Sequence, residues 1–537
     1  MPPPELDLFR TTYELRVGPN KRVTVSKSNE ARAESAVAVN PLNPANMICA
    51  SKRFYDRAAY KSSIGISFTK DGGTTWTEVP LPATPKHPEF TWLVDPDVAF
   101  DSKGNCYLWA EPVDKPPQLE TIAMVAYRST DGGANFQETA IIHNDGNDDK
   151  GWIAADQRLS GAHAGRLYAV WGASTPLRFA RSSDQGTTWT GIGGQTAGAD
   201  VQPQHNSFAP AMAIDDDGTV HVAWQIPGTT RLTYTRSTDG GNSFEPFRDI
   251  CDNIVSLTSA LTKQENWPVL PGGNFRLLTM ATLAVNGDEV MVAWPDMRDG
   301  VCRIYIASSG DGGDTWPAAL SGVPLLPDYP LDANHHFMPQ IDCAGGIFGC
   351  AFYEYDTTLS PHKIHVDISV RWPRRDTFEP PVRVTDHPWD PTIKPPTVHA
   401  TTTVTFIGDY FGIAAGDDFY ELVWTDTRTG QQELFSCTVK IESHTKGPPE
   451  IIATIIAGVV QDGGGWIIVG GHLVKIPPWD PGVDILHALA SAATARGIPG
   501  SVGRALEAQA LRGVASLATA AAKKSAAKAA AQKSAGV

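Results

Sequence analysis

The chain has little charge for its length and contains no long apolar run. Only 19% of its 537 residues are charged, and although 42% are hydrophobic, no stretch of twenty consecutive residues is apolar. These deficits exclude a coiled coil and a membrane-spanning helical bundle. Gly (49) and Pro (41) are plentiful instead, which favours a globular, turn-rich protein with many short strands.

Cysteine and positive charge are also scarce. The seven cysteines lie between Cys49 and Cys437 without CxxC spacing, so we expect mostly buried thiols rather than a zinc site or a full disulfide framework. The net charge of −15 argues against a nucleic-acid partner, because the phosphates would repel the protein. The first ten residues, MPPPELDLFR, lack a basic region followed by an apolar stretch, so no secretory signal is visible.

Two internal repeats dominate what is present. The pattern Ser/Thr-x-Asp-x-Gly-x-x-Trp/Phe occurs five times, at residues 69–76, 129–136, 182–189, 237–244 and 309–316. Each copy lies between two strand-like stretches, which predicts a hairpin loop. The Asp carboxylate can accept backbone N–H groups of its own turn, Gly supplies positive φ, and the aromatic ring anchors the loop.

A second unit consists of an inner strand, a tight turn and a strand that often ends in Trp. It occurs at 33–53, 95–110, 152–171, 209–224, 279–294, 338–353 and 408–424. Seven copies at a period of about sixty residues predict an all-β fold, a β-propeller of seven four-stranded blades. Residues 21–26 are predicted to supply the missing outer strand of the last blade, which removes an exposed edge. Six blades plus a separate hairpin is the alternative.

The five loops are similar to the Asp-box, or BNR, repeat, and residues 21–445 resemble the sialidase superfamily of Asp-box propellers. Phrases such as AESAVAVNP and Trp294-Pro-Asp-Met-Arg298 resemble those of bacterial sialidase-like proteins. The resemblance implies a glycan-directed propeller located outside the cell. The repeat also occurs in lectin-like and receptor propellers, so it does not by itself imply turnover.

Propeller topology places the connections before the inner strands and after the second strands on one face, where acids, arginines and aromatics collect. A ring of mixed charge could bind a carboxylate-bearing sugar, because Arg offers a planar fork to a carboxylate. Ion pairing within the scaffold is the alternative, and it is favoured where the phrase Trp-x-Asp-x-Arg repeats, at Asp296/Arg298 and Asp426/Arg428. The residues expected to contact the ligand are Arg32, Arg53, Arg57, Asp97, Arg276, Arg298, Asp409, Asp426 and Arg428.

The resemblance also implies catalytic roles, because a retaining sialidase uses a Tyr nucleophile, an Asp acid/base and three arginines. Tyr410 matches the nucleophile and Asp56 the start of the acid/base loop, while Arg32 and Arg53 match two of the arginines. The match is partial, since Arg32 lacks the expected neighbouring Phe and Pro. The remaining candidates, for the Tyr-activating Glu and the third arginine, are Glu265, Arg276 and Arg298.

No cofactor or metal is expected. Asp145, Asn147 and Asp149 alternate as oxygen ligands do, but no acidic residue completes a twelve-residue calcium loop. His335 and His336 have no third ligand at a recognisable spacing.

The composition changes after residue 445. Residues 1–20 are expected to be an N-terminal arm, 446–481 a small β-meander with strands near 451–460, 466–469 and 473–476, and 482–537 an Ala/Lys-rich helical tail. From 491 to 537 there are seven Lys or Arg against one acid, so this tail is either a solvated appendage or a docking segment for a protein partner. Two functions follow: a glycan-directed propeller, with or without exo-sialidase activity, and a non-catalytic protein-interaction propeller.

Overall fold

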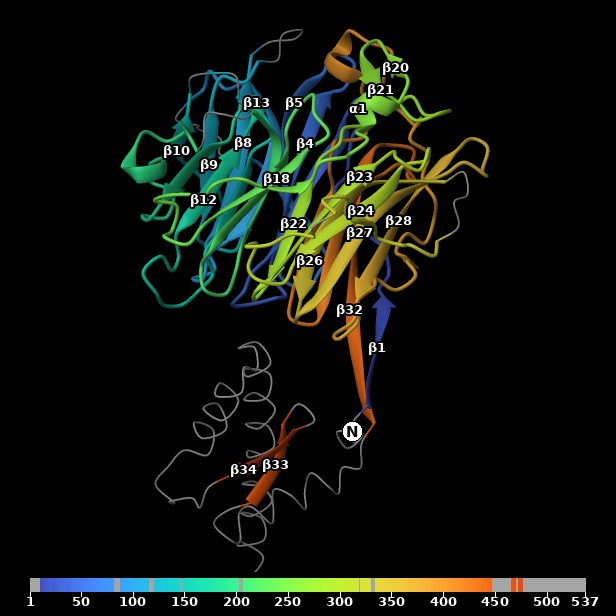
Figure 1. Cartoon of the computed structure of the whole chain (residues 1–537). Helices are drawn as coiled ribbons and strands as arrows, with labels where there is room; N and C mark the ends of the chain where they lie inside the picture. Colours follow the sequence, from blue (N-terminus) through green and yellow to red (C-terminus); the bar gives the residue numbers. More distant parts are fainter. Residues whose placement is uncertain are drawn as a thin grey trace, which may run out of the picture. The chain divides into compact units, whose positions relative to one another are not determined.

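The computed structural model describes residues 10–81, 87–114, 120–144, 146, 148–201, 206–317, 319–329, 334–446, 465–469 and 472–476 (Figure 1). The chain divides into two compact units. One is Leu15–Ile441, and the other combines Met1–Glu14 with Glu442–Val537.

The larger unit is a seven-bladed β-propeller, as the sequence predicted, and its first four blades follow the chain in order. Blade 1 contains β3 (Ala31–Val39), β4 (Met47–Asp56), β5 (Lys61–Thr69) and β6 (Thr77–Val79). Blade 2 contains β7 (Trp92–Phe100), β8 (Cys106–Val113), β9 (Met124–Ser129) and β10 (Gln137–His143). Blade 3 contains β11 (Trp152–Ala155), β12 (Leu167–Trp171), β14 (Arg178–Ser182) and β15 (Ala199–Asp200). Blade 4 contains β16 (Asn206–Ile214), β17 (Val220–Gln225), β18 (Leu232–Ser237) and β19 (Arg248–Cys251), with β13 (Ala173–Pro176) added beside β16.

The last three blades complete the ring. Blade 5 contains β22 (Thr282–Asn286), β23 (Glu289–Asp296), β24 (Arg303–Ser309) and β25 (Val323–Pro324). Blade 6 contains β26 (His335–Ala344), β27 (Ile347–Asp356), β28 (Lys363–Arg371) and β29 (Val382–Arg383). Blade 7 contains β30 (Gly412–Ala415), β31 (Phe419–Asp426) and β32 (Glu433–Lys446), and the N-terminal strands β1 (Arg10–Val17) and β2 (Lys21–Arg22) both pair with β32.

The closure of blade 7 by the N-terminus is confirmed, but its extent differs from the prediction. Only Lys21 and Arg22 of the expected strand 21–26 pair as a strand, and β1 lies within residues 1–20, the predicted N-terminal arm. The chain beyond Arg22 stays close to β32 through other bonds, since Leu434 N–H donates to Thr24 Oγ1 at 2.9 Å and Ser26 N–H donates to Glu433 at 2.9 Å. Buried hydroxyl and carboxylate acceptors replace the regular ladder there.

The apolar core lies in layers between consecutive blades. One layer joins Ile48 and Ile66 of blade 1 to Leu108 of blade 2, and another joins Tyr234 of blade 4 to Trp294 of blade 5. The second strands of blades 2, 3, 4, 5 and 7 contribute fully buried indoles, which are Trp109, Trp171, Trp224, Trp294 and Trp424. Six of the seven cysteines are buried and all seven are free thiols, as expected.

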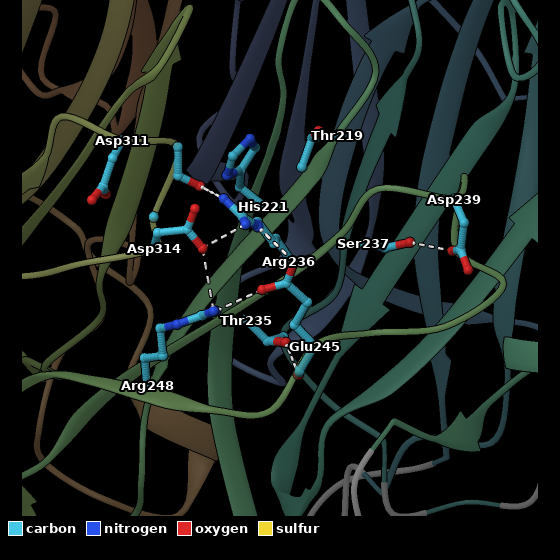
Figure 2. Close-up of polar contacts among 12 residues, drawn as sticks. Thr219, His221, Thr235, Arg236, Ser237, Asp239, Glu245, Arg248, Asp311 and Asp314 are labelled. Atoms are coloured by element: carbon cyan, nitrogen blue, oxygen red, sulfur yellow. Dashed lines mark hydrogen bonds and ion pairs between the residues drawn. The ribbon is translucent and has the colours of Figure 1, made fainter.

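The five repeated loops have the hydrogen bonds that their residue types predict. In the loop of blade 4, Ser237 Oγ donates to Asp239 at 2.9 Å (Figure 2) and accepts from the N–H of Gly241 at 2.8 Å. Asp239 also accepts from the N–H of Ser243 at 2.9 Å. Gly241 has φ +77°, a conformation that side chains resist. The loop is therefore a turn that satisfies its own polar groups.

The same face carries an ion network between blades 4 and 5 (Figure 2). Arg236 contacts Glu245 at 3.0 Å and Asp314 at 2.7 Å. Arg248 contacts Glu245 at 2.8 Å and Asp314 at 3.4 Å. Because Asp314 belongs to the blade 5 loop, these contacts bind neighbouring blades together at their surface.

On the opposite face, two long connections form a feature that we name the cap, residues 256–281 and 389–411. It contains α1 (Leu257–Ala260), β20 (Lys263–Gln264), β21 (Trp267–Pro268) and the short 3-10 helix η2 (Val398–Ala400); the other 3-10 helix, η1 (Ile192–Gly194), belongs to blade 3. The two halves of the cap lie side by side (Figure 1) and are joined by a parallel bridge between Phe275 and Thr405. The cap packs on the start of blade 1, because Val398 and Phe406 share an apolar cluster with Ala31, Phe54 and Tyr60.

In the smaller unit, β33 (Gly465–Val469) and β34 (His472–Ile476) form an antiparallel hairpin, close to two of the three expected strands. The expected strand at 451–460 and the helical tail at 482–537 lie outside the described residues. Within the described part of the chain, no helix combines the length and hydropathy that crossing a bilayer requires.

Candidate functional site

A strained backbone position recurs at the start of the inner strands. The pairing register shifts once between β3 and β4 and once between β7 and β8. At each shift one residue has a left-handed φ: Glu34 in β3 at +52° and Asp95 in β7 at +48°. Lys150, just before β11, has φ +54°. Ala209 and Met338 occupy the equivalent bulges of blades 4 and 6. The left-handed position thus recurs in the fold, with a β-bulge in blades 1, 2, 4 and 6. Blades 1, 2 and 3 place a charged side chain at this position, although such backbone costs about 1–2 kcal/mol per residue.

These three side chains meet in one buried ion network. The Lys150 ammonium lies 3.2 Å from Glu34, 2.5 Å from Asp95 and 2.9 Å from Asp409. Lys52 of β4 lies 3.5 Å from Glu34 and 4.0 Å from Asp95. None of these five side chains is more than 6% exposed. Blades 1, 2 and 3 and the connection into blade 7 therefore converge on a single point.

The cap adds Arg276 to this network. Its guanidinium makes a two-point contact with the Asp409 carboxylate, in which Nε lies 3.0 Å from Oδ1. The guanidinium also stacks on Trp267 at 4.7 Å and on Phe406 at 4.8 Å. A bidentate, stacked arginine is rigid and fully engaged, so Arg276 ties the two halves of the cap to each other, and Asp409 in turn contacts Lys150 of the propeller.

Burial and like charges perturb the acids of this region. Burial, and then Asp95, raise the pKa of Glu34 to about 7. Burial likewise raises the pKa of Asp149 to about 6, with Lys150 opposing and Asp95 adding to the rise. Burial and the nearby Asp95 and Asp149 carboxylates raise the pKa of Glu111 well above its usual range. Asp95 behaves oppositely, because Lys150 and Lys52 outweigh its burial and lower its pKa. Neighbouring carboxyl groups whose pKa values are shifted in opposite directions are typical of functional sites, although structural ion networks also produce such shifts.

Tyr410 lies beside the network but is not arranged as a nucleophile. Its hydroxyl donates to the Pro96 carbonyl at 3.0 Å, and its ring packs against Trp152 at 5.0 Å between centroids. Burial, and then Glu34 and Asp95, raise the pKa of Tyr410 well above its usual value. Glu265, the candidate activating base, instead accepts from the N–H of Thr403 at 2.7 Å in the cap.

The two arginines matched to the sialidase pattern are paired with acids away from Tyr410. Arg32 is buried and contacts Glu78 of the outer strand β6 at 2.5 Å and Glu30 at 3.8 Å. The Arg53 guanidinium lies 2.9 Å from the Glu30 carboxylate. The structure thus brings Arg32 and Arg53 together around Glu30, but not with Arg276.

The other predicted residues of blade 1 lie in the turn after β4. Asp56 caps this turn by accepting from the N–H of Ala59 at 3.2 Å. Arg57 is half-buried, and its backbone N–H donates to Asn29 at 3.0 Å. Asp97 in β7 accepts from the N–H of Ile153 at 2.8 Å and so joins blades 2 and 3; burial raises the pKa of Asp97 to about 7.

The repeated Trp-x-Asp-x-Arg phrases form matching units within blades 5 and 7. Asp296 accepts from Trp294 Nε1 at 3.0 Å and contacts Arg298 at 2.5 Å. Asp426 contacts Arg428 at 2.7 Å and accepts from the Trp424 indole at 3.1 Å. Each arginine also stacks on an aromatic ring of its own blade, at 4.2 Å for Arg298 and 4.4 Å for Arg428. This geometry agrees with the alternative in which these residues form ion pairs within the scaffold.

The sequence reasoning missed Lys52 and Lys150, the two basic residues at the centre of the network. A signal for Lys150 was available. Aligning Asp149-Lys150-Gly151 with Val94-Asp95-Pro96 and Phe208-Ala209-Pro210 places Lys150 on the bulge position, which precedes a Pro or Gly. Lys52 gives no such signal, because lysine in a second strand usually faces solvent.

An open cavity of about 330 Å³ lies beside the cap. Its lining includes Phe275 and Thr405 of the cap and Tyr355 and His362 of blade 6, together with Asn274, Pro361, Pro391, Thr392 and Pro395. The Tyr355 ring packs edge-on against Phe275 at 5.6 Å and against His362 at 5.3 Å. The hydroxyl of Tyr355 lies 3.1 Å from His362 Nδ1. Aromatic rings, prolines and a few polar groups therefore share one concave surface, which we name the cap groove.

No protein-family model matches the chain, and no curated protein matches it. Solved structures that resemble it include a protein of unknown function from Dyadobacter fermentans, at 13% identity and TM-score 0.42 over 80% of this chain and 99% of that one. The NanB sialidase of Streptococcus pneumoniae is 12% identical, with TM-score 0.40 over 65% and 69% of the two chains. The α-L-arabinanase of Penicillium chrysogenum is 12% identical, with TM-score 0.35 over 64% and 92%. The chain is a seven-bladed β-propeller by its own sheets, and its solved neighbours include a sialidase and an arabinanase.

Proposed function

We propose that this protein is a glycan-binding propeller whose ligand occupies the cap groove. The observation that carries the proposal is the concave surface of about 330 Å³ on which Phe275, Tyr355 and His362 are arranged around a common space. That volume is within the range of small-ligand sites, which are mostly apolar with a few orienting polar groups. A sugar ring has apolar C–H faces that pack on aromatic rings and hydroxyls that bond to groups such as Asn274 and Thr392.

A neutral sugar fits the groove better than the carboxylate-bearing sugar expected from the resemblance. Among the described residues that line the groove, none is Arg or Lys. Arg32, Arg53 and Arg276 are each engaged by a carboxylate elsewhere. A ligand carboxylate in the groove would thus be partly desolvated without a guanidinium partner, which is unfavourable.

Turnover by Tyr410 and Asp56 is not supported by this geometry. The Tyr410 hydroxyl is bonded to a backbone carbonyl, and Asp56 accepts from its own turn. We therefore propose binding without sialidase chemistry. From the sequence resemblance and composition we further propose that the five loops are Asp-boxes and that the protein is bacterial and extracellular. We also propose that residues 446–537 bind a protein partner.

The test is a glycan-array screen with the full chain, followed by calorimetry on the best neutral oligosaccharide. We expect His362→Ala to weaken binding at least tenfold, because it removes a wall of the groove and the partner of the Tyr355 hydroxyl. His387→Ala is the matched control, since His387 is 73% exposed and pairs with Asp386. Equal binding by the two variants, or release of fluorophore from a sialoside by the wild type, would refute the proposal.

A further inference from the structure

Three carboxylates from blades 2 and 3 lie together, and one of them, Asp95, also belongs to the buried ion network. Asp95, Glu111 and Asp149 each offer a carboxylate oxygen, and these oxygens all lie within 4.8 Å of one another. Asp95 and Glu111 are buried, whereas Asp149 is partly exposed. Three acids held this close repel each other unless protons or a cation lie between them.

Glu111 supplies a separate observation. Its side chain is fully buried, and Oε1 accepts from the Gly151 N–H at 2.9 Å and the Trp109 indole at 3.4 Å. Gly151 permits this approach, because a Cβ there would lie 2.1 Å from the Trp109 ring. Glu111 Oε2 has no hydrogen-bond partner. A buried carboxylate oxygen without a donor is costly and needs an explanation such as an ion.

The basic groups nearby do not provide that partner. The Lys150 ammonium forms an ion pair with one carboxylate oxygen of Asp95 and also contacts Glu34 and Asp409. In the described part of the chain, neither Glu111 nor Asp149 has a Lys or Arg within 4 Å. Across the whole region there are five acids against three bases, namely Glu34, Asp95, Glu111, Asp149 and Asp409 against Lys52, Lys150 and Arg276. Two negative charges are therefore in excess when all are ionised.

We propose that Asp95, Glu111 and Asp149 bind a calcium ion. A dication balances the excess charge, and a donor set made only of carboxylate oxygens suits a hard cation rather than zinc or copper. Two oxygens on one Ca²⁺, each at about 2.3–2.6 Å, lie at most about 5 Å apart, and the three carboxylates meet this condition. Ca²⁺ is favoured over Mg²⁺ because it accepts irregular sets of carboxylate oxygens, whereas Mg²⁺ requires near-ideal octahedral geometry. The ion would link blades 2 and 3, a role separate from glycan binding in the cap groove.

Terbium luminescence tests the site directly, because Tb³⁺ replaces Ca²⁺ at oxygen sites and is excited by a nearby indole. Trp109 is hydrogen-bonded to Glu111, so Tb³⁺ bound there should emit when tryptophan is excited. We expect saturable emission at one equivalent of Tb³⁺ that is displaced by Ca²⁺. Glu111→Gln should lower the apparent Tb³⁺ affinity at least tenfold.

Glu421→Gln is the matched control. Glu421 is also fully buried and has one carboxylate oxygen without a hydrogen-bond partner, but it lies in blade 7 away from the three acids. We expect this variant to bind Tb³⁺ as the wild type does. If Glu111→Gln does not fold, the partly exposed Asp149→Asn replaces it. In addition, Ca²⁺ should raise the melting temperature of the wild type but not of the variant that lacks the ligand.

The proposal is overturned if the wild type shows no saturable emission. It is overturned equally if Glu111→Gln and Asp149→Asn bind Tb³⁺ as tightly as Glu421→Gln does. Neither result bears on glycan binding, because the cap groove shares no residue with the three carboxylates.

Discussion

Replacing Lys150 with Met tests whether the buried ion network around Lys150 is one coupled unit. The ammonium contacts Glu34, Asp95 and Asp409 at 2.5–3.2 Å, and the Lys150 side chain is only 5% exposed. One contact at about 3 Å contributes about 5 kcal/mol at an effective dielectric constant of about 20, before the cost of desolvation. Removing one partner of a buried pair costs about 3–5 kcal/mol net, because the remaining charges lose their counter-charge. We expect Lys150→Met to lower the free energy of unfolding by at least about 3 kcal/mol.

The assay is urea unfolding followed by tryptophan fluorescence, with Lys363→Met as the control. Lys363 also pairs with one acid, Asp390 at 2.9 Å, but its side chain is 25% exposed, so its loss should cost less than about 1 kcal/mol. The reasoning is refuted if Lys150→Met is no more destabilising than Lys363→Met.

Three further experiments test other parts of the fold. Asp426→Asn should lower the free energy of unfolding by about 3 kcal/mol, because it leaves the Arg428 guanidinium without its buried partner; an unchanged melting temperature would contradict this. Burial raises the pKa of Glu421 to about 7, whereas the unfolded value is about 4.3. Between pH of about 4 and 7 the unfolded state therefore binds fewer protons than the folded state. As pH rises through this range, the free energy of unfolding of the wild type should fall by up to about 3 kcal/mol relative to that of Glu421→Gln. A pH-independent difference in melting temperature would disprove it. A double-mutant cycle on Arg236→Met and Asp314→Asn should give a coupling below about 1 kcal/mol, because Asp314 is 53% exposed; a coupling above about 2 kcal/mol would show that the blade 4–5 network is stronger than its exposure implies.

Much of the architecture could be predicted because it depends on local patterns that repeat. Each of the five loops contains the residues that satisfy its own hydrogen bonds, as Ser237 and Asp239 show. The closing strand was harder, because the alternating run at residues 21–26 looks like a full strand. Thr24 and Ser26 instead use side-chain and carboxylate bonds to the last blade, and the regular pairing is supplied partly by Arg10–Val17.

The candidate site was predicted only in outline. Asp409 and Arg276 were named as members of a charged face and do meet, in a buried bidentate pair. Arg32 and Arg53 were named for the same face, but acids specific to blade 1 engage them. Residue type and position along a strand indicate which face a side chain is near, yet they do not indicate which neighbour neutralises it.

By itself, the sequence determined the blade repeat, the loop chemistry and the face on which charge collects, because each depends on residues within one hairpin of each other. The tertiary structure alone decided that Glu34, Asp95, Lys150 and Asp409 share one buried point. These residues come from four different blades or their connections, and only closure of the ring brings them together. Partner choice among buried charges is a property of that closed geometry, since Coulomb energy depends on separation in space rather than along the chain.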